Sequence, residues 1–286
     1  MLTLSLPETP VSTIKHVIFL FTFPLLFAAS GCVVQASDTT LPAPAIDTIN
    51  GRRVESLTLR HGGNGGVVVF EGGSRNTLDK WGTVPAQIAR DATVFAYHRP
   101  GYGNSEAVAT ARDGRTIVEE LRTVLRHQGL PPPYVLVGHS LGGLYVQLFA
   151  RLYPEEVKGL VLVDALYPGM VKKSEDFPLT TRLLGRLATS RTVWREIEQI
   201  DATGAMVLEL PAAVGLPVVR LVNQPVSKTA VGVDFGAFRL DRATRDSVEA
   251  LYPAAHKVVV DSSHQMALTS PEVVVDAIRE ILRAPD

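Results

Sequence analysis

The most informative part of the sequence is VLVGHSLGG, residues 135–143. An aliphatic run ends at Gly138, a histidine and a serine follow, and a second apolar run begins soon after them. A G-x-S-x-G pattern between a strand and a helix lifts the serine above the carboxyl edge of a sheet. The glycines leave room where a Cβ would meet the adjoining strand and helix. The stretch therefore predicts Ser140 as a nucleophile at a strand–helix turn.

Short runs rich in valine and leucine alternate with amphipathic stretches from about Asn50 to the end of the chain. The runs predict strands at residues 54–60, 67–70, 93–97, 131–138, 157–165, 216–223 and 256–263. Helical periodicity predicts helices at residues 116–129, 140–154 and 271–283. The turn HGGNGG is expected to join the first two strands as a hairpin. This alternation predicts an α/β fold with a mostly parallel sheet covered on both faces.

The exception to the alternation lies between Leu166 and Leu210, where no run resembles a strand. One or two amphipathic helices are expected within residues 179–200, and they predict a helical lid over about 166–212. Their arginines (182, 186, 191 and 195) favour a solvated helix face over a membrane-facing surface.

The overall composition excludes some functions. With 28 basic and 29 acidic residues, the chain has no net field that would attract nucleic acid. Its length suffices for one sizeable core, and 46% of its residues are hydrophobic. We therefore expect a single globular domain over residues 50–286 that does not bind nucleic acid.

The first 36 residues have the features of an export signal. Lys15 and His16 precede an apolar run from Val17 to Ala29, which is short for a membrane-spanning helix. Cys32, the single cysteine, lies in ASGC, which resembles a lipoprotein cleavage site and favours a lipidated, membrane-attached cysteine. Cleavage after Ala36 is the alternative. The expected location is the periplasm or cell envelope, with a secreted soluble protein as the other reading.

The general base is sought among seven histidines. His139 is adjacent to Ser140, where backbone geometry turns the two side chains apart. Of the others, His98 and His264 follow strands and so lie at the carboxyl edge. His264 follows the last strand and completes the chain order serine, aspartate, histidine, so it is the predicted base. His98 is the less favoured candidate for the base, and its alternative role is to pack in a loop against Tyr102.

The acid that orients the base should end a strand. Asp164 ends the run GLVLVD and is favoured. Asp234 is the alternative acid, because the segment after residue 223 offers no earlier carboxylate. Capping the start of the lid is the other role open to Asp164.

Two backbone N–H groups are expected to form an oxyanion hole. Leu141, directly after the serine, supplies one, and Ser74, after Gly72 and Gly73, supplies the other.

These segments together resemble the α/β-hydrolase superfamily, in particular small bacterial hydrolases with an elbow of the type LVGHSxGG. The resemblance rests on residues 67–81, 95–105, 134–165 and 258–282. It implies an eight-stranded sheet, Ser140 as nucleophile, His264 as base, Leu141 and Ser74 as oxyanion donors, and no cofactor. His98 stands where the family usually has aspartate, which should alter a loop hydrogen bond rather than the chemistry.

The predicted function is an exported serine hydrolase that cleaves small carboxylic esters through an acyl-enzyme, with neither cofactor nor metal. Peptidase, lactonase and perhydrolase activities use the same groups and stay open. A ligand-binding envelope protein without catalysis is the alternative of another class. A serine nucleophile argues against the haloalkane dehalogenases and epoxide hydrolases of this superfamily.

Overall fold

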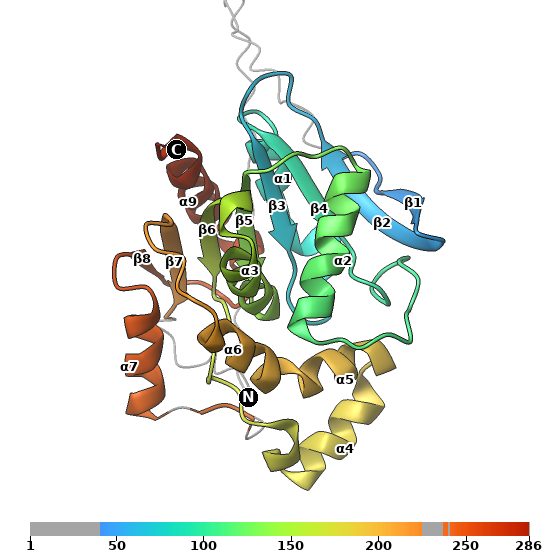
Figure 1. Cartoon of the computed structure of the whole chain (residues 1–286), viewed down its shortest axis with the longest axis vertical. Coiled ribbons are helices and arrows are strands. Elements are labelled where there is room, and N and C mark those ends of the chain that lie inside the picture. Colours follow the sequence, from blue (N-terminus) through green and yellow to red (C-terminus); the bar gives the residue numbers. More distant parts are fainter. Residues whose placement is uncertain (1–40, 225–236, 240, 286) are drawn as a thin grey trace, which may run out of the picture. The chain divides into compact units, whose positions relative to one another are not determined.

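The structure, a computed structural model, describes residues 41–224, 237–239 and 241–285. These residues form a compact unit built on an eight-stranded sheet of order β1-β2-β4-β3-β5-β6-β7-β8 (Figure 1). The strands are β1 (Ala45–Ile49), β2 (Arg52–Leu59), β3 (Val67–Glu71), β4 (Thr93–Tyr97), β5 (Tyr134–His139), β6 (Val157–Val163), β7 (Val218–Asn223) and β8 (His256–Val260).

The sheet is mostly parallel, as the sequence predicts. Strands β3 to β8 all run in one direction, and only β1 and β2 run antiparallel to their neighbours. All the turns that follow the parallel strands therefore meet at one edge, where binding sites of such sheets lie.

The hairpin predicted between residues 54–60 and 67–70 is wrong. Strand β4 lies between β2 and β3, and its Ala96 pairs antiparallel with Leu57 of β2. The glycine-rich residues 61–66 therefore carry the chain past one strand. This pairing brings together strands about forty residues apart, so it has no local signal.

A real hairpin joins β1 to β2, and the sequence prediction omitted it. Asn50 and Gly51 form its two-residue turn with φ of 50° and 77°. Asn-Gly is the commonest pair in such turns, because both central residues need positive φ. This signal was present in the sequence.

Helices cover both faces of the sheet. They are α1 (Val84–Ile88), α2 (Gly114–His127), α3 (Leu141–Leu152), α4 (Leu179–Ala188), α5 (Arg191–Glu198), α6 (Ile200–Glu209), α7 (Arg242–Leu251), α8 (Met266–Thr269) and α9 (Pro271–Arg283). Helices α2 and α3 lie on the near face in Figure 1, and α1 and α9 pack on the other face. Each face of the sheet carries its own hydrophobic core. In β3, Val67 and Val69 belong to the core beneath α2 and α3, whereas Val68 and Phe70 belong to the core beneath α1 and α9, so this strand is buried on both sides.

Three helices, α4, α5 and α6, occupy the interval between β6 and β7, and we call them the insertion. The prediction of one or two helices missed α6, because its sequence contains Gly204 and no clear apolar period. A Cβ on Gly204 would lie 3.1 Å from the Cα of Pro168, so the glycine permits a close approach there. Helices α1 and α7 were likewise not predicted.

Several predictions fall outside the described residues: the signal segment 1–36 with Cys32 and Ala36, and the alternative acid Asp234. Within the ranges that the structure describes, no helix combines the length and apolar character needed to cross a bilayer.

Candidate active site

Ser140 lies at the turn from β5 into α3, where its backbone has φ 52° and ψ −121°. Residues with a side chain rarely adopt positive φ, and such strain clusters at functional sites. Two hydrogen bonds hold the turn: the Ser140 N–H donates to the Val163 carbonyl at 3.2 Å, and its carbonyl accepts from the Leu166 N–H at 2.8 Å. The serine is therefore fixed to the end of β6 as well as to its own strand.

The glycines around Ser140 are required by close packing. A Cβ on Gly142 would lie 2.1 Å from the Glu71 carbonyl oxygen, and one on Gly138 would lie 2.6 Å from the Cα of Gly143. Both distances are far below a normal contact. The steric reading of the G-x-S-x-G pattern therefore agrees with the structure.

A cavity of about 600 Å³ covers this turn. Its floor is the carboxyl edge of the sheet, where Ser74, Ser140, Asp164 and His264 follow β3, β5, β6 and β8. Its walls are mainly apolar side chains of the insertion and adjoining loops: Leu166, Met170, Val171, Phe177, Leu184, Trp194, Ile197, Ile200 and Phe238. The structure thus brings every predicted site residue within the described ranges to one cavity.

His264 and Asp164 form a hydrogen-bonded pair, with 2.6 Å between His264 Nδ1 and Asp164 Oδ2. The other Asp164 oxygen, Oδ1, accepts from the Asn223 N–H at 3.4 Å. Asp164 also has a positive φ, 40°, directly after β6. A carboxylate accepts hydrogen bonds, so Nδ1 carries the proton in this pair and Nε2 is left free as a base.

His139, next to the serine, has a contact that the sequence prediction did not foresee. The Asn76 amide nitrogen lies 2.7 Å from its Nδ1, and its Nε2 lies 2.7 Å from the His264 carbonyl oxygen. This arrangement fits the neutral tautomer that accepts at Nδ1 and donates from Nε2. Burial, and to a smaller extent the neighbouring imidazole of His264, lower the pKa of His139 to about 4. His139 therefore anchors the backbone of His264 as a neutral side chain.

Both predicted oxyanion donors, Leu141 and Ser74, line the cavity. Leu141 is the first residue of α3, so its N–H has no acceptor within the helix. Ser74 lies in the loop after β3, and its buried hydroxyl has no hydrogen-bond partner among the described residues. A Cβ on the preceding Gly73 would lie 2.9 Å from the Ser140 Cβ, so the loop passes close to the serine. The cavity therefore offers unpaired donors beside Ser140.

Arg99 fixes the direction of that loop. Its guanidinium donates to the Gly72 carbonyl at 2.6 Å and to the Gly73 carbonyl at 3.1 Å. The C=O and N–H of a trans peptide point in opposite directions, so holding the Gly73 carbonyl also sets the direction of the Ser74 N–H. Sequence reasoning missed this role, because nothing in HRPGYG shows which carbonyls the arginine reaches.

Arg99 also joins the loop to the insertion through buried charges. It contacts Glu71 at 2.5 Å and Glu196 of α5 at 3.0 Å, and all three side chains are almost fully buried. Burial would raise the pKa of Glu196, but the guanidinium of Arg99, with that of Arg112, holds the pKa below its usual value. Removing one member of such a cluster leaves an uncompensated buried charge.

The other histidines lie away from the chemistry. His98 is buried, its Nδ1 lies 2.6 Å from Glu55 Oε2, and its Nε2 accepts from the Leu78 N–H. These bonds connect the residue after β4 to β2 and to the turn at Leu78, and the hydroxyl of Tyr102 donates to Glu196. Across the part of the chain that the structure describes, no group of three or more His, Cys, Asp or Glu side chains is placed to hold a metal ion.

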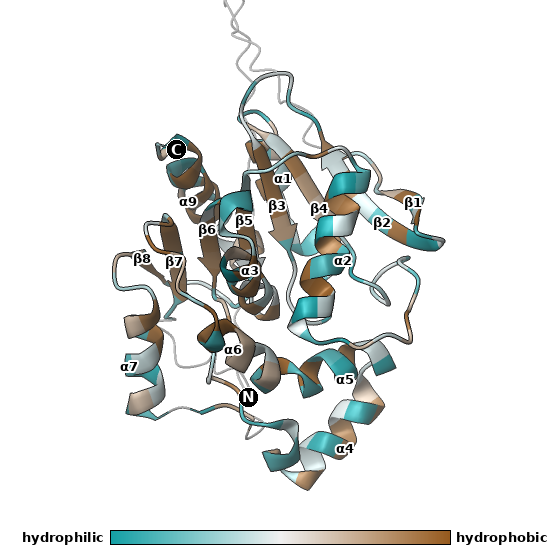
Figure 2. Cartoon of the chain, viewed as in Figure 1, coloured by the Kyte–Doolittle hydropathy of each residue, from teal (hydrophilic) through white to brown (hydrophobic). Residues whose placement is uncertain are grey.

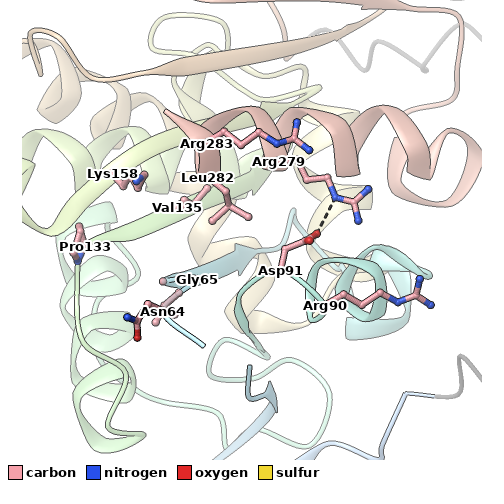
Figure 3. Close-up of a pocket in the computed structure, with 12 residues that line it drawn as sticks. Asn64, Gly65, Arg90, Asp91, Pro133, Val135, Lys158, Arg279, Leu282 and Arg283 are labelled. Atoms are coloured by element: carbon pink, nitrogen blue, oxygen red, sulfur yellow. Dashed lines mark hydrogen bonds and ion pairs between the residues drawn. The ribbon is translucent and has the colours of Figure 1, made fainter. Parts of the chain in front are cut away.

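A second hollow, of about 560 Å³, lies at the opposite, amino edge of the strands (Figure 3). Four basic residues line it (Arg90, Lys158, Arg279 and Arg283), together with a single acidic residue, Asp91. Arg279 donates to Asp91 at 2.8 Å, the dashed line in Figure 3. This hollow, which we call the basic hollow, contains none of the predicted site residues.

Comparison with known proteins agrees with this architecture. Residues 57–192 match the family model described as alpha/beta hydrolase fold. The crystal structure of Cfl2 from Burkholderia cenocepacia superimposes with a TM-score of 0.62 at 18% identity, covering 86% of this chain and 98% of that one. At that identity the likeness concerns the fold.

Two curated relatives are similar over shorter stretches. The uncharacterized protein YqjL of Bacillus subtilis is 32% identical over 105 residues, 37% of this chain and 42% of that protein. A soluble epoxide hydrolase of Corynebacterium sp. is 31% identical over 136 residues, 48% of this chain and 46% of that protein. The matches thus span less than half of the length of these relatives.

Proposed function

We propose that the chain is a serine hydrolase of the α/β-hydrolase superfamily that cleaves carboxylic esters through an acyl-enzyme, because residues 57–192 match the alpha/beta hydrolase fold model and the sheet has that architecture. One observation carries the proposal. A serine held at positive φ opens into the same cavity as a histidine whose Nδ1 is bonded to an aspartate at 2.6 Å. That combination of nucleophile, base and orienting acid suits acyl transfer.

The proposed reaction uses groups already placed on the cavity floor. Ser140 Oγ attacks the ester carbonyl carbon while His264 Nε2 takes its proton. The Leu141 and Ser74 N–H groups stabilise the oxyanion, and Asp164 stabilises the imidazolium. Collapse expels the alcohol, which leaves with the proton from His264. Water then attacks the acyl-enzyme with His264 again as base, releasing the acid and restoring Ser140.

An epoxide substrate fits this nucleophile poorly, although one relative is named as an epoxide hydrolase. Attack of a serine hydroxyl on an epoxide would leave an ether on the enzyme, which water does not hydrolyse. Attack on an ester carbonyl leaves an ester, which the same base and oxyanion donors hydrolyse. The apolar cavity walls suit an ester with an aliphatic or aromatic acyl group.

Active-site labelling tests the proposal. A fluorophosphonate should label the wild-type chain and not Ser140→Ala, and short-chain p-nitrophenyl esters should be hydrolysed by the wild type and not by this variant. Ser263→Ala is the matched control, because Ser263 is the neighbour of His264 in the chain but does not line the cavity. It should keep both labelling and hydrolysis. Labelling that survives in Ser140→Ala, or turnover of styrene oxide without ester hydrolysis, would overturn the proposal.

Export with lipidation of Cys32 is a further part of the proposal, and it rests on residues 15–32 of the sequence. Cells expressing the full chain should incorporate labelled palmitate into the protein, and Cys32→Ser should abolish incorporation. Release of an unlabelled protein cut after Ala36 would instead support plain secretion.

A further inference from the structure

Helix α4 turns its leucines toward solvent. Leu179, Leu183 and Leu187 recur at every fourth position and are 71%, 58% and 77% exposed. Figure 2 shows brown, hydrophobic segments of α4 at the lower edge of the view. A helix on a globular protein normally buries such a stripe. None of the residues of α4 is buried, so its apolar side is uncovered.

The side of α4 that faces the cavity carries Thr181, Leu184, Gly185 and Ala188. A Cβ on Gly185 would lie 2.1 Å from the Trp194 ring, so the helix approaches α5 through this glycine. Leu184 both lines the cavity and is 61% exposed, which places it at the cavity rim. The outward orientation of the leucines therefore follows from packing that a rotation of the helix would break.

Basic side chains accompany the exposed leucines. Helix α4 carries Arg182 and Arg186 and no acidic residue, although Arg186 pairs with Glu198 of α5 at 3.0 Å. The stretch from Lys172 to Arg191 has five basic residues against two acidic ones, whereas the chain as a whole is nearly neutral. An apolar stripe flanked by arginines is the pattern of helices that lie in the headgroup region of anionic membranes.

In place of the solvated helix face expected from the sequence, we propose that α4 docks on an anionic lipid surface through Leu179, Leu183 and Leu187, with Arg182 and Arg186 near the headgroups. Insertion into the lipid would remove three leucine side chains from water, and the anionic headgroups would attract the two arginine side chains. A second copy of the chain suits the surface less well, because a two-fold contact through α4 would set the same arginines against each other. The apolar side already faces outward, so docking requires no opening of the insertion.

Docking through α4 would place the rim of the cavity next to the lipid surface. Four α4 residues line the cavity: Thr181, Leu184, Gly185 and Ala188. Leu184 at the rim is continuous with the leucine stripe. The docking goes beyond the proposed esterase function and does not depend on it, because it concerns binding rather than turnover.

Site-specific fluorescence tests the docking in the full chain. In a Cys32→Ser background, NBD is attached at Leu187→Cys or, as the matched control, at Val214→Cys. Val214 is also an exposed aliphatic residue (95%), and it lies at the amino edge of the sheet. With phosphatidylglycerol vesicles we expect a blue shift and loss of iodide quenching at position 187 alone, and little change with phosphatidylcholine.

A loss-of-binding variant completes the test. Leu183→Ser with Leu187→Ser should weaken the docking of α4 roughly a hundredfold, about tenfold for each leucine that no longer enters the lipid. Insertion of α4 in this double variant is measured by the fluorescence of NBD attached at Leu179→Cys. Hydrolysis of a soluble short-chain ester should be unchanged, because neither leucine lines the cavity.

Three outcomes would overturn the inference. An unshifted label at position 187 with anionic vesicles shows that α4 does not dock. An equal shift at position 214 shows nonspecific adsorption or docking by the basic hollow. A shift that needs no lipid but grows with protein concentration identifies a second copy of the chain as the occupant. Because none of these readouts uses turnover, they are separate from failure of the esterase proposal.

Discussion

The two hollows at opposite edges of the sheet are nearly equal in volume, about 600 Å³ and 560 Å³, yet their chemistry differs. The cavity at the carboxyl edge has apolar walls, a serine at positive φ and a histidine–aspartate pair. The basic hollow has four basic residues and a partly exposed ion pair, and no serine lines it. Size therefore does not distinguish a reactive site from a surface depression.

The difference follows from the direction of the strands. At the carboxyl edge, β5 and β6 are each followed by a residue held at positive φ, Ser140 and Asp164. At the amino edge the strands begin after loops that pack through glycine: a Cβ on Gly65 would lie 1.9 Å from the Asp91 carbonyl. Strain at one edge holds the proposed nucleophile and acid, whereas close packing at the other edge serves the fold.

Among substitutions outside the nucleophile itself, Asp164→Asn should have the largest effect. Asparagine tolerates positive φ, so the backbone at 40° is retained while the acceptor for His264 Nδ1–H is lost. We expect the kcat for short-chain esters to fall by roughly 10³- to 10⁴-fold. Asp234→Asn is the matched control. If Asp234→Asn lowers kcat and Asp164→Asn does not, the assignment of the acid is reversed.

Acid should destabilise the protein through His139. Its pKa is about 4 in the fold against an ordinary 6.5, so the unfolded chain binds the proton more readily between these values. The contribution to the free energy of unfolding is complete above pH 6.5 and falls by roughly 3 kcal/mol as the pH drops to 4.

Urea titrations at several pH values check this, with the wild type compared with His139→Gln. The variant should lose this part of the pH dependence, because glutamine does not titrate. His256→Asn, at the amino edge, should keep it. Parallel curves for wild type and His139→Gln would show that His139 is not held neutral by the fold.

Arg99→Lys should lower kcat by about 10²-fold, with KM little changed. Lysine keeps the positive charge beside Glu71 and Glu196 but has no planar fork to hold two carbonyls at once. Arg112→Lys is the control, because Arg112 contacts Glu196 and Glu120 without touching the loop. Equal losses of kcat in both variants would assign Arg99 a role in stability alone.

The smallest effect is expected in the basic hollow. Arg279→Ala breaks the pair with Asp91, whose side chains are 30% and 39% exposed. Exposed pairs contribute about 0–1 kcal/mol, so the urea midpoint should barely move and ester hydrolysis should be unaffected. A loss of activity in Arg279→Ala would mean that the two hollows communicate through α9.

The sequence predicted the elements whose signal is local. The elbow at Ser140, the last helix and the runs that form β3 to β8 were all recognisable from apolar period and turn chemistry. The false hairpin shows the limit, because the pairing of Leu57 with Ala96 is decided by which strand fits beside β2 in the folded sheet. Helix α6 was missed for a related reason, since Gly204 is explained only by its contact with Pro168.

The candidate site divides in the same way. His264 and Asp164 were predicted from strand ends, and the structure brings them within hydrogen-bond distance. Arg99 meets Glu196 across 97 residues of sequence, and His139 reaches the His264 backbone across 125. Such partners have no spacing rule, so a single sequence does not disclose them.

The contact between Arg99 and Glu196 also has a consequence for protein engineering. It divides the insertion into a replaceable part and a fixed part. A chimera that exchanges residues 179–189 for a foreign helix would leave the buried carboxylate of α5 in place. A graft that replaces Glu196 would leave the buried guanidinium of Arg99, beneath the loop at Ser74, without this carboxylate partner. Donor segments should therefore end before Ser190.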